Sequence, residues 1–327
     1  MRRLNQNLLK YLSITEVNRF LLLIFLSIFI FALNPFFLSE ANLGLVLVWG
    51  SIYAIMVMGA TLYLLVGALD LSFGGVITLS NVLAAILMLW YGFPVWLAVL
   101  IVLILGFTTG LATCYFGLTF SPPFRFILPT FIFTLMLSFV YIGAMRIVTR
   151  AFPVYGLPES YSLISRSTIG PIPIVTIYMI VILAILGFFI YYRPIGKHIY
   201  ATGLNDDVAR RVGVNVKKVR LIALSVGSLI QAFAGVLLGS QLAQGSVLIG
   251  PTYLLPILAG AFIGGVSLAG GEGSLFGAIL GGFTIYLIEN IIVTLAVEAF
   301  WKEVVVGLFL LLFVLLDFIQ KRRTMRR

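Results

Sequence analysis

The sequence is short of the residues that most often carry chemistry in soluble proteins. Its 327 residues include one cysteine, Cys114, and one histidine, His198, and only 10% of them are charged. A single cysteine excludes an internal disulfide framework and a zinc site built on cysteines. The lone histidine stands beside Lys197 in a polar stretch, so the chain offers no Ser/His/Asp set for nucleophilic catalysis. We expect a protein that is not itself an enzyme and holds no metal.

A nucleotide-binding P-loop is also missing. The nearest approach is Gly196-Lys197, but His198 follows it and Tyr191 stands where the first glycine of Gly-x-x-x-x-Gly-Lys-Ser/Thr belongs. No cofactor is therefore expected in this chain. If the protein moves a solute uphill, either a partner ATPase must hold and hydrolyse ATP with Mg²⁺, or an ion gradient must supply the energy.

Apolar residues dominate what is present. They make up 61% of the chain, and the mean hydropathy is +1.16, which is more apolar surface than a soluble domain of this size can bury. We expect an all-α, polytopic protein of the cell membrane, cytoplasmic or inner, surrounded by the lipid bilayer. A net charge of +10 in a soluble protein could indicate nucleic acid, but here it fits membrane orientation, and no nucleic-acid partner is expected.

Apolar runs of about 20 residues predict ten membrane spans. The expected spans are residues 20–37, 43–66, 76–91, 95–117, 126–148, 173–192, 221–244, 253–269, 274–296 and 303–319. Ten spans place both termini on one side of the membrane. That side also holds residues 193–220 and carries 17 of the 21 Lys and Arg residues, so the positive-inside rule makes it cytoplasmic. Residues 149–172 then form a loop outside the cytoplasm.

The strongest local signal lies within the charged residues 193–220. It consists of Asn205, Asp206, Asp207, Val208, Ala209, Arg210, Arg211, Val212 and Gly213. The asparagine suits a helix N-cap, the aspartates suit the first turn, the arginines follow toward the other end, and the glycine suits a left-handed stop. Such a helix of about two turns is marginal alone in water. It is either an ordinary cytoplasmic loop helix or a contact for another protein, with Val208 and Val212 on one face and Ala209 nearby.

Residues 67–75 place Asp70 and Ser72 among glycines directly after the second span. A carboxylate at membrane depth costs a few kcal/mol, so it needs a partner, water or a role. The glycines permit irregular backbone, which is tolerated there only under protein cover or beside a water-filled cavity. Two interpretations stay open: a broken-helix element that lines a transport pathway, or a tight cytoplasmic turn in which Asp70 caps the third span.

Further polar residues lie inside expected spans. Glu289 and Asn290 fall well inside the ninth span, where a carboxylate is expected to face the bundle interior or a cavity, and Asn81 lies in the third. Sparse polar groups of this kind suit an uncharged polar substrate. The candidates for the substrate pathway or its gate are Asp70, Ser72, Asn81, Glu289 and Asn290. Hydrogen bonding between helices is the alternative role.

Three stretches, taken in order, resemble motifs of the membrane permeases of ribose-type ABC importers. Residues 67–75 resemble the family's Gly-Gly-Ile-Asp-Leu-Ser-x-Gly. Residues 196–214 resemble its Gly-x-x-x-x-Ala-x-Gly-x-Asn-x-x-x-Ala-x-x-x-Gly-Ile, and residues 264–273 resemble its Gly-Gly-Thr-Ser-Leu-x-Gly-Gly-x-Gly. The resemblance runs from about residue 45 to residue 317.

The resemblance implies a single transmembrane permease domain over residues 1–327, of the type II importer architecture. Residues 205–213 would form a coupling helix seated in a groove of a separate ATP-binding subunit, with Ala209 and Gly213 on the small positions of the motif. It also implies an extracytoplasmic substrate-binding protein and a second permease subunit, identical or related. The substrate would be a small neutral polar nutrient, a monosaccharide in the first place, moved by alternating access.

The chain departs from the family pattern in three places. Ala68-Leu69 precedes the aspartate where relatives have Gly-Ile, the eighth span reads Leu254-Leu255-Pro256-Ile257 instead of an acidic run, and Glu289-Asn290 replaces paired asparagines. These departures weaken the assignment of any one sugar. A nucleoside or another small nutrient is an alternative substrate. An ion-coupled carrier that uses Asp70 or Glu289 is an alternative mechanism, and a scaffold membrane protein is a third possibility.

Overall fold

The computed structural model describes residues 19–21, 23–32, 34–120, 127–295, 298, 300–308 and 311. Within them the chain is almost entirely helical. Its helices are η1 (Pro35–Leu38), α2 (Glu40–Leu65), α3 (Phe73–Leu89), α4 (Val95–Phe120), α5 (Ile127–Thr149), α6 (Glu159–Arg166), α7 (Ile174–Gly187), η2 (Phe188–Tyr192), α8 (Pro194–Leu204), α9 (Asp206–Arg211), α10 (Val216–Leu242), α11 (Ile249–Ile263) and α12 (Leu275–Thr294). Four two-residue strands are β1 (Val154–Tyr155), β2 (Thr168–Ile169), β3 (Ile172–Pro173) and β4 (Gln244–Gly245).

Six helices in the described part of the chain are long and apolar enough to cross a membrane: α2, α4, α5, α7 with η2, α10 and α12. Shorter apolar helices occupy Arg19–Ala32, α3 and α11. Nine of the ten expected spans therefore coincide with apolar helices. The tenth, residues 303–319, lies largely outside the described residues, so the count of ten stays a prediction.

Several expected boundaries are wrong, and local backbone chemistry explains two of the following three. The seventh span starts earlier, at Val216, because the side chain of Asn215 accepts a hydrogen bond from Lys218 N at 3.0 Å and caps the helix. The eighth, α11, ends at Ile263 because the glycine-rich turn that follows includes Gly265 at φ +76. The third, α3, begins at Phe73 instead of residue 76.

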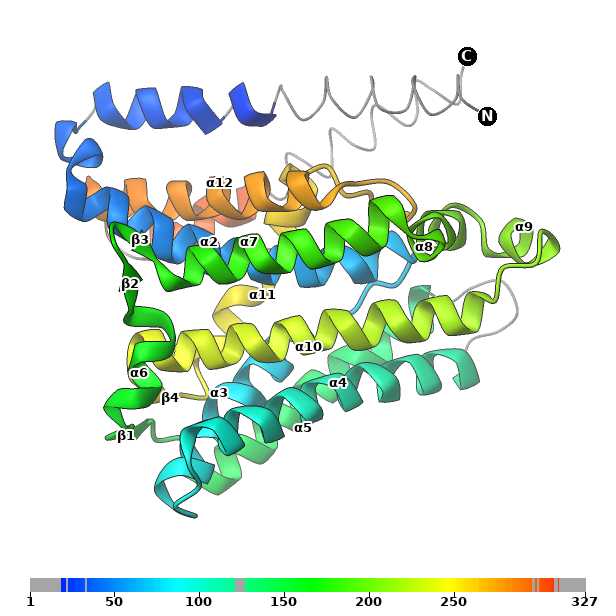
Figure 1. Cartoon of the computed structure of the whole chain (residues 1–327), viewed down its shortest axis with the longest axis horizontal. Helices are drawn as coiled ribbons and strands as arrows, with labels where there is room; N and C mark the ends of the chain where they lie inside the picture. The colour runs from blue at the N-terminus through cyan, green and yellow to red at the C-terminus, as the bar shows by residue number, and fades with distance from the viewer. Residues whose placement is uncertain are drawn as a thin grey trace.

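The two polar segments lie at opposite ends of the bundle (Figure 1). The end that holds α8 and α9 is called the inner end here, and the end that holds α6 and the four strands is called the outer end. At the outer end β1 pairs with β4 and β2 pairs with β3, both antiparallel. Residues 149–172 and 193–220 are thus separated as the span count requires, while their sides of the membrane remain a prediction.

The helix α10 forms the centre of the bundle and packs against α2, α3, α4 and α6. Small residues let the backbones approach closely, as they do at helix interfaces in membranes. Gly227 lies against Tyr63 of α2, and Gly235 lies against the backbone of Ile77 in α3. Side chains between these helices are almost fully buried, so α10 is held over most of its length.

Orientation can be tested with single cysteines, because the native Cys114 is buried. We expect Ile169→Cys in β2, which is 60% exposed, to react with a membrane-impermeant thiol reagent in intact cells. Lys217→Cys, exposed at the start of α10, should react only after the cells are opened. The reverse pattern would place the inner end outside the cell.

Candidate functional site

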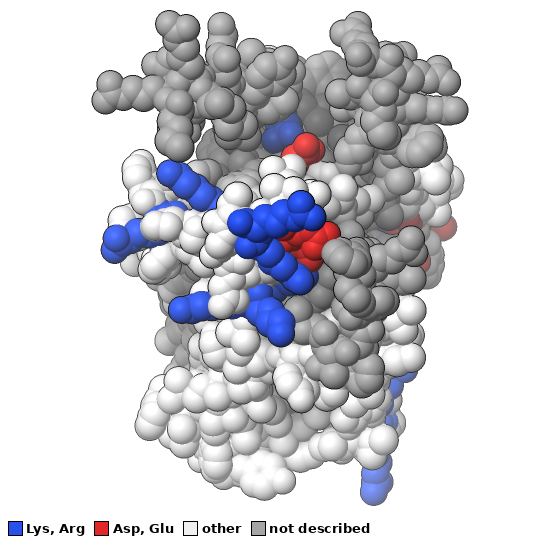
Figure 2. Space-filling model, turned by 90° about the vertical axis from the view of Figure 1, so that its right-hand side faces the viewer, with Lys and Arg blue, Asp and Glu red and all other residues white. Residues whose placement is uncertain are grey.

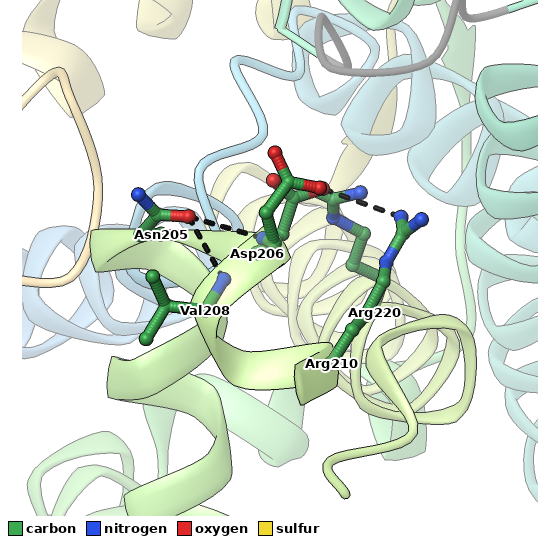
Figure 3. A network of polar contacts seen from close by, with 6 residues as sticks. Asn205, Asp206, Val208, Arg210 and Arg220 are labelled. Atoms are coloured by element: carbon green, nitrogen blue, oxygen red, sulfur yellow. Dashed lines mark hydrogen bonds and ion pairs between the residues drawn. The ribbon is translucent and has the colours of Figure 1, made fainter. Parts of the chain in front are cut away.

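The expected polar helix is present at the inner end as α9 (Figure 3). The Asn205 Oδ1 accepts hydrogen bonds from the backbone N–H groups of Asp207 and Val208, each at 3.1 Å. Beyond the other end, Gly213 has φ +87 and its N–H donates to Arg210 O at 3.0 Å. The helix predicted over residues 205–213 is therefore confirmed, with Asp206–Arg211 as its helical part.

The two faces of α9 differ from the expectation in one respect. Val208 and Val212 point outward and are 56% and 74% exposed. Ala209, expected near the valines, is only 2% exposed and faces the bundle. The helix therefore presents apolar side chains to its surroundings, while its alanine provides the close packing that holds it to the protein.

Charges surround this apolar face. Figure 2, which looks at the right-hand side of Figure 1, shows Lys and Arg side chains gathered around a small acidic patch. The exposed basic residues of the segment are Arg193, Lys197, Arg210, Arg211, Lys217 and Lys218. Two exposed valines on a short helix, surrounded by a basic rim, are an arrangement that suits a protein-docking surface.

Asp206 in the first turn of α9 is paired twice (Figure 3). Its Oδ2 lies 3.3 Å from Arg210 Nη2 on the same helix. It also lies 3.3 Å from Nη2 of Arg220, which belongs to α10. The Arg220 side chain is only 6% exposed, compared with 49% for Arg210. Asp206 therefore connects the exposed α9 to a buried charge on the central helix.

The three glycine-containing stretches noted in the sequence meet at one place beneath α8. A Cβ added to Gly203 would overlap Leu65 O and Gly271 N, and Gly271 N donates to Leu65 O at 3.1 Å. A Cβ on Gly270 would come within 2.7 Å of Gly67 Cα. Backbone from α8, from the end of α2 and from the turn before α12 is thus in direct contact. We call Gly67, Gly203, Gly270 and Gly271 the glycine junction.

Past the glycine junction the chain turns back into the bundle as an extended segment that leads to α3. Asp70 in this segment is 1% exposed, and its Oδ1 accepts a hydrogen bond from Ser72 N at 2.6 Å. Leu71 N donates to Thr134 Oγ1 of α5 at 2.9 Å. The segment is buried and irregular, as the broken-helix interpretation requires, but the bond from Ser72 N also places Asp70 directly before the start of α3, as the capping interpretation requires, so the pathway role of Asp70 stays a prediction. Asp70 Oδ2 and the hydroxyl of Ser72 have no hydrogen-bond partner among the described residues.

The start of α3, which follows this segment, lies against the start of another short helix, α11. A Cβ on Gly250, near the start of α11, would overlap Gly74 O and Thr78 Oγ1 at the start of α3. Both α3 and α11 are shorter than a full span, and this contact brings their first turns together inside the bundle. Interrupted helices whose first turns meet within the bundle form the polar sites of many transporters.

Asn81 and Asn290 form hydrogen bonds that join separate parts of the chain. Asn81 Oδ1 accepts from Ser246 N at 2.7 Å, and Asn81 Nδ2 donates to Gln244 O at 3.3 Å, which ties α3 to the outer turn. Asn290 pairs with Asn42 of α2 at 2.9 Å. These contacts are those of the helix-bonding alternative. The pathway role of either asparagine stays a prediction.

Glu289 lies in a cluster of aromatic and charged side chains toward the outer end of α12. Tyr53 Oη donates to Glu289 Oε1 at 2.5 Å, and Lys302 Nζ lies 2.9 Å from Glu289 Oε2. The rings of Tyr253 and Tyr286 flank Tyr53 with centroid separations of 5.3 and 6.2 Å. Lys302 Nζ also lies 5.8 Å from the centre of the Tyr253 ring. Four parts of the chain thus converge on one carboxylate.

Comparison with known proteins gives consistent matches along most of the chain. A family described as the permease component of the branched-chain amino acid transport system matches residues 42–315. The ribose import permease of Bacillus subtilis is 32% identical over 305 residues, which cover 92% of each chain. The chain belongs to this family of ABC importer permeases.

Other relatives agree with that assignment. The ribose import permease of Haemophilus influenzae is 28% identical and covers 92% of this permease and 93% of its own length. An autoinducer 2 import system permease of an Enterobacter strain is 30% identical, with coverage of 92% and 86%. The resemblance based on three motifs is confirmed, and the permease is a multi-pass protein of the inner membrane.

Sequence reasoning missed several residues of these sites. Tyr53 gave no signal, because a tyrosine in an apolar span has no special spacing. Lys302 is a single basic residue with no motif around it, although its position after the ninth span is compatible with a pairing to Glu289. The expected seventh span begins at residue 221 and leaves Arg220 outside it, whereas the structure begins α10 at Val216, after the cap at Asn215, and so includes Arg220.

The glycine junction of the permease predicts a sharp contrast between two glycines. Gly203→Ala must displace backbone atoms and is expected to lower stability by about 1–3 kcal/mol or more. Gly143→Ala, in α5, meets nothing within 4 Å and is expected to raise helix stability by ~1 kcal/mol. Melting temperatures of the purified permease in detergent would measure both. Equal melting temperatures for the two variants would contradict the close backbone contact.

Proposed function

We propose that this chain is the permease subunit of an ABC importer and that it forms the membrane pathway for a monosaccharide. ATP hydrolysis takes place on a separate ATP-binding subunit, which holds ATP and Mg²⁺. The observation that carries the proposal is α9, which exposes Val208 and Val212 at the inner end within a rim of basic residues. An ion-coupled carrier needs no such docking helix.

The mechanism is alternating access driven from the inner end. Closure of the nucleotide-binding domains moves α9, which sits in a groove of the ATP-binding subunit. The motion reaches the bundle, where the glycine junction joins α8 to the ends of the spans. An extracytoplasmic binding protein delivers the sugar at the outer end, and a second permease subunit, identical or related, completes the pathway.

The substrate class follows from the polar groups and from the relatives. Most polar side chains buried within the described spans are uncharged, and the carboxylate of Glu289 pairs with Lys302 at 2.9 Å. Such a pathway favours a neutral polar solute over a charged one. The relatives whose names specify a sugar are ribose permeases. A pentose or a compound of similar size is therefore the substrate proposed first.

Docking through the valines of α9 is tested by affinity purification from gently solubilised membranes. The wild-type permease should bring down an ATP-binding subunit. Val208→Asp places a charge on the apolar contact and should abolish that recovery, since a buried unpaired charge costs several kcal/mol. Ile169→Asp is the matched control, because it adds the same charge at an exposed position of the outer end and should leave recovery unchanged.

Two results would contradict this docking. One is a wild-type permease that purifies without any ATP-binding subunit under conditions that preserve other transporter complexes. The other is equal recovery from Val208→Asp and wild type.

The outer cluster gives a second test of the pathway. Glu289→Gln removes the charge that pairs with Lys302, and it should reduce sugar uptake to about a tenth, the effect of ~1.4 kcal/mol. Recovery of the ATP-binding subunit should stay unchanged, because Glu289 lies far from α9. Glu298→Gln is the control, since its carboxylate forms no ion pair among the described residues. Normal uptake by Glu289→Gln would remove Glu289 from the pathway.

A further inference from the structure

The attachment of α9 to the membrane bundle is slight. Among its six helical residues only Ala209 is buried. The chain between α9 and α10 passes through Gly213, which has φ +87 and open space around it. The backbone hydrogen bonds of this turn, from Gly213 N to Arg210 O and from Val214 N to Ala209 O, lie within the turn itself and do not tie α9 to a membrane helix. If α9 were held by the chain alone, part of any displacement would be lost as a hinge motion.

The ion pair between Asp206 and Arg220 provides a second connection between α9 and α10, which would oppose such a hinge motion. It joins Asp206 in the first turn of α9 to Arg220 near the start of α10 (Figure 3), and it thereby bridges the turn that contains Gly213. Arg210 meets the same carboxylate but belongs to α9 itself, so it adds no connection between elements. Of the two arginines that meet Asp206, only Arg220 therefore connects α9 to α10.

Burial makes this contact stiff. The Arg220 side chain is 6% exposed, and a buried guanidinium is stable only with a well-placed acceptor. Separating the pair would leave that charge without its carboxylate in a region of low dielectric. Surface ion pairs such as that between Arg210 and Asp206 resist displacement far less.

The helix that receives the force is itself rigidly packed. A short way along α10 from Arg220, the backbone at Leu224 and Ser225 lies directly against Gly110 of α4. Farther along, Gly227 meets α2 and Gly235 meets α3. Close-packed contacts of this kind transmit displacement instead of absorbing it. A shift of α10 therefore reaches three neighbouring helices.

We propose that Arg220 is a positioning residue that couples α9 to α10 through Asp206, so that movement imposed on α9 reaches the membrane helices. This inference rests on the proposed docking of α9 to an ATP-binding subunit. It assigns the transmission step to one ion pair, whereas the valines of α9 serve only the docking.

The decisive variant is the neutral pair Asp206→Asn with Arg220→Met. Either single change leaves one partner without the other and is expected to lower stability. The double change leaves no buried charge without its partner, since Arg210, which also loses Asp206, is 49% exposed, so the double variant should fold normally. Its complex with the ATP-binding subunit should assemble and hydrolyse ATP when the loaded binding protein is added. Sugar uptake per ATP hydrolysed should nevertheless fall about tenfold, within the range of coupling between contacting residues.

Two further variants serve as controls for that result. Arg220→Lys keeps the charge and should recover most of the uptake per ATP. Arg146→Met removes an exposed charge from α5, outside the docking surface and where no ion pair forms among the described residues, and should leave the ratio unchanged.

The inference is overturned if the double variant has normal stability and normal uptake per ATP, because the pair would then be purely structural. It is also overturned if the double variant folds but no longer binds the ATP-binding subunit, since the pair would then serve docking. A wild-type permease without any ATP-binding subunit would instead refute the proposed function itself.

Discussion

Backbone contact at the glycine junction is the constraint on which the rest of the arrangement depends. Gly203 at the end of α8 touches the end of α2 and the turn before α12 so closely that no side chain fits. This contact fixes where α8 ends and therefore where α9 begins. It also sets the point from which the segment with Asp70 returns into the bundle. The glycine junction consequently positions both the docking surface of α9 and the segment that leads to α3.

Charge placement separates the two ends of the permease. At the inner end, Asp206, whose side chain is 21% exposed, pairs with Arg220, whose side chain is 6% exposed, which suits a link between an exposed helix and a buried one. Toward the outer end, Glu289 pairs with Lys302 and Tyr53 within an aromatic cluster. Asp70 is buried in the extended segment before α3, with one oxygen unpaired among the described residues. Ionisable groups within membrane proteins are rare, and burying them costs free energy, so each of these three sites is expected to lower the stability of the fold.

Local chemistry made much of this fold predictable. The apolar runs located nine spans, and the cap at Asn205 with the glycine at Gly213 located α9, because both signals act within a few residues. The three motifs also identified the family. Contacts between distant segments were not predictable: nothing in the sequence shows that Gly203 meets Gly271, that Tyr53 reaches Glu289, or that Ala209 faces inward. The sequence does not place Arg220 within α10, because a polar turn and the polar first turn of a membrane helix have the same composition.

The central claim is that ATP hydrolysed on a partner drives a sugar through this chain. The most direct measurement is uptake of radiolabelled sugar into vesicles that contain the permease and its ATP-binding subunit, with the loaded binding protein outside. Ionophores collapse all ion gradients in the same vesicles. The account predicts uptake that requires ATP inside and is unchanged by the ionophores. Uptake that proceeds without ATP and stops when the gradients collapse would contradict it and would make Asp70 the ion-binding residue to examine.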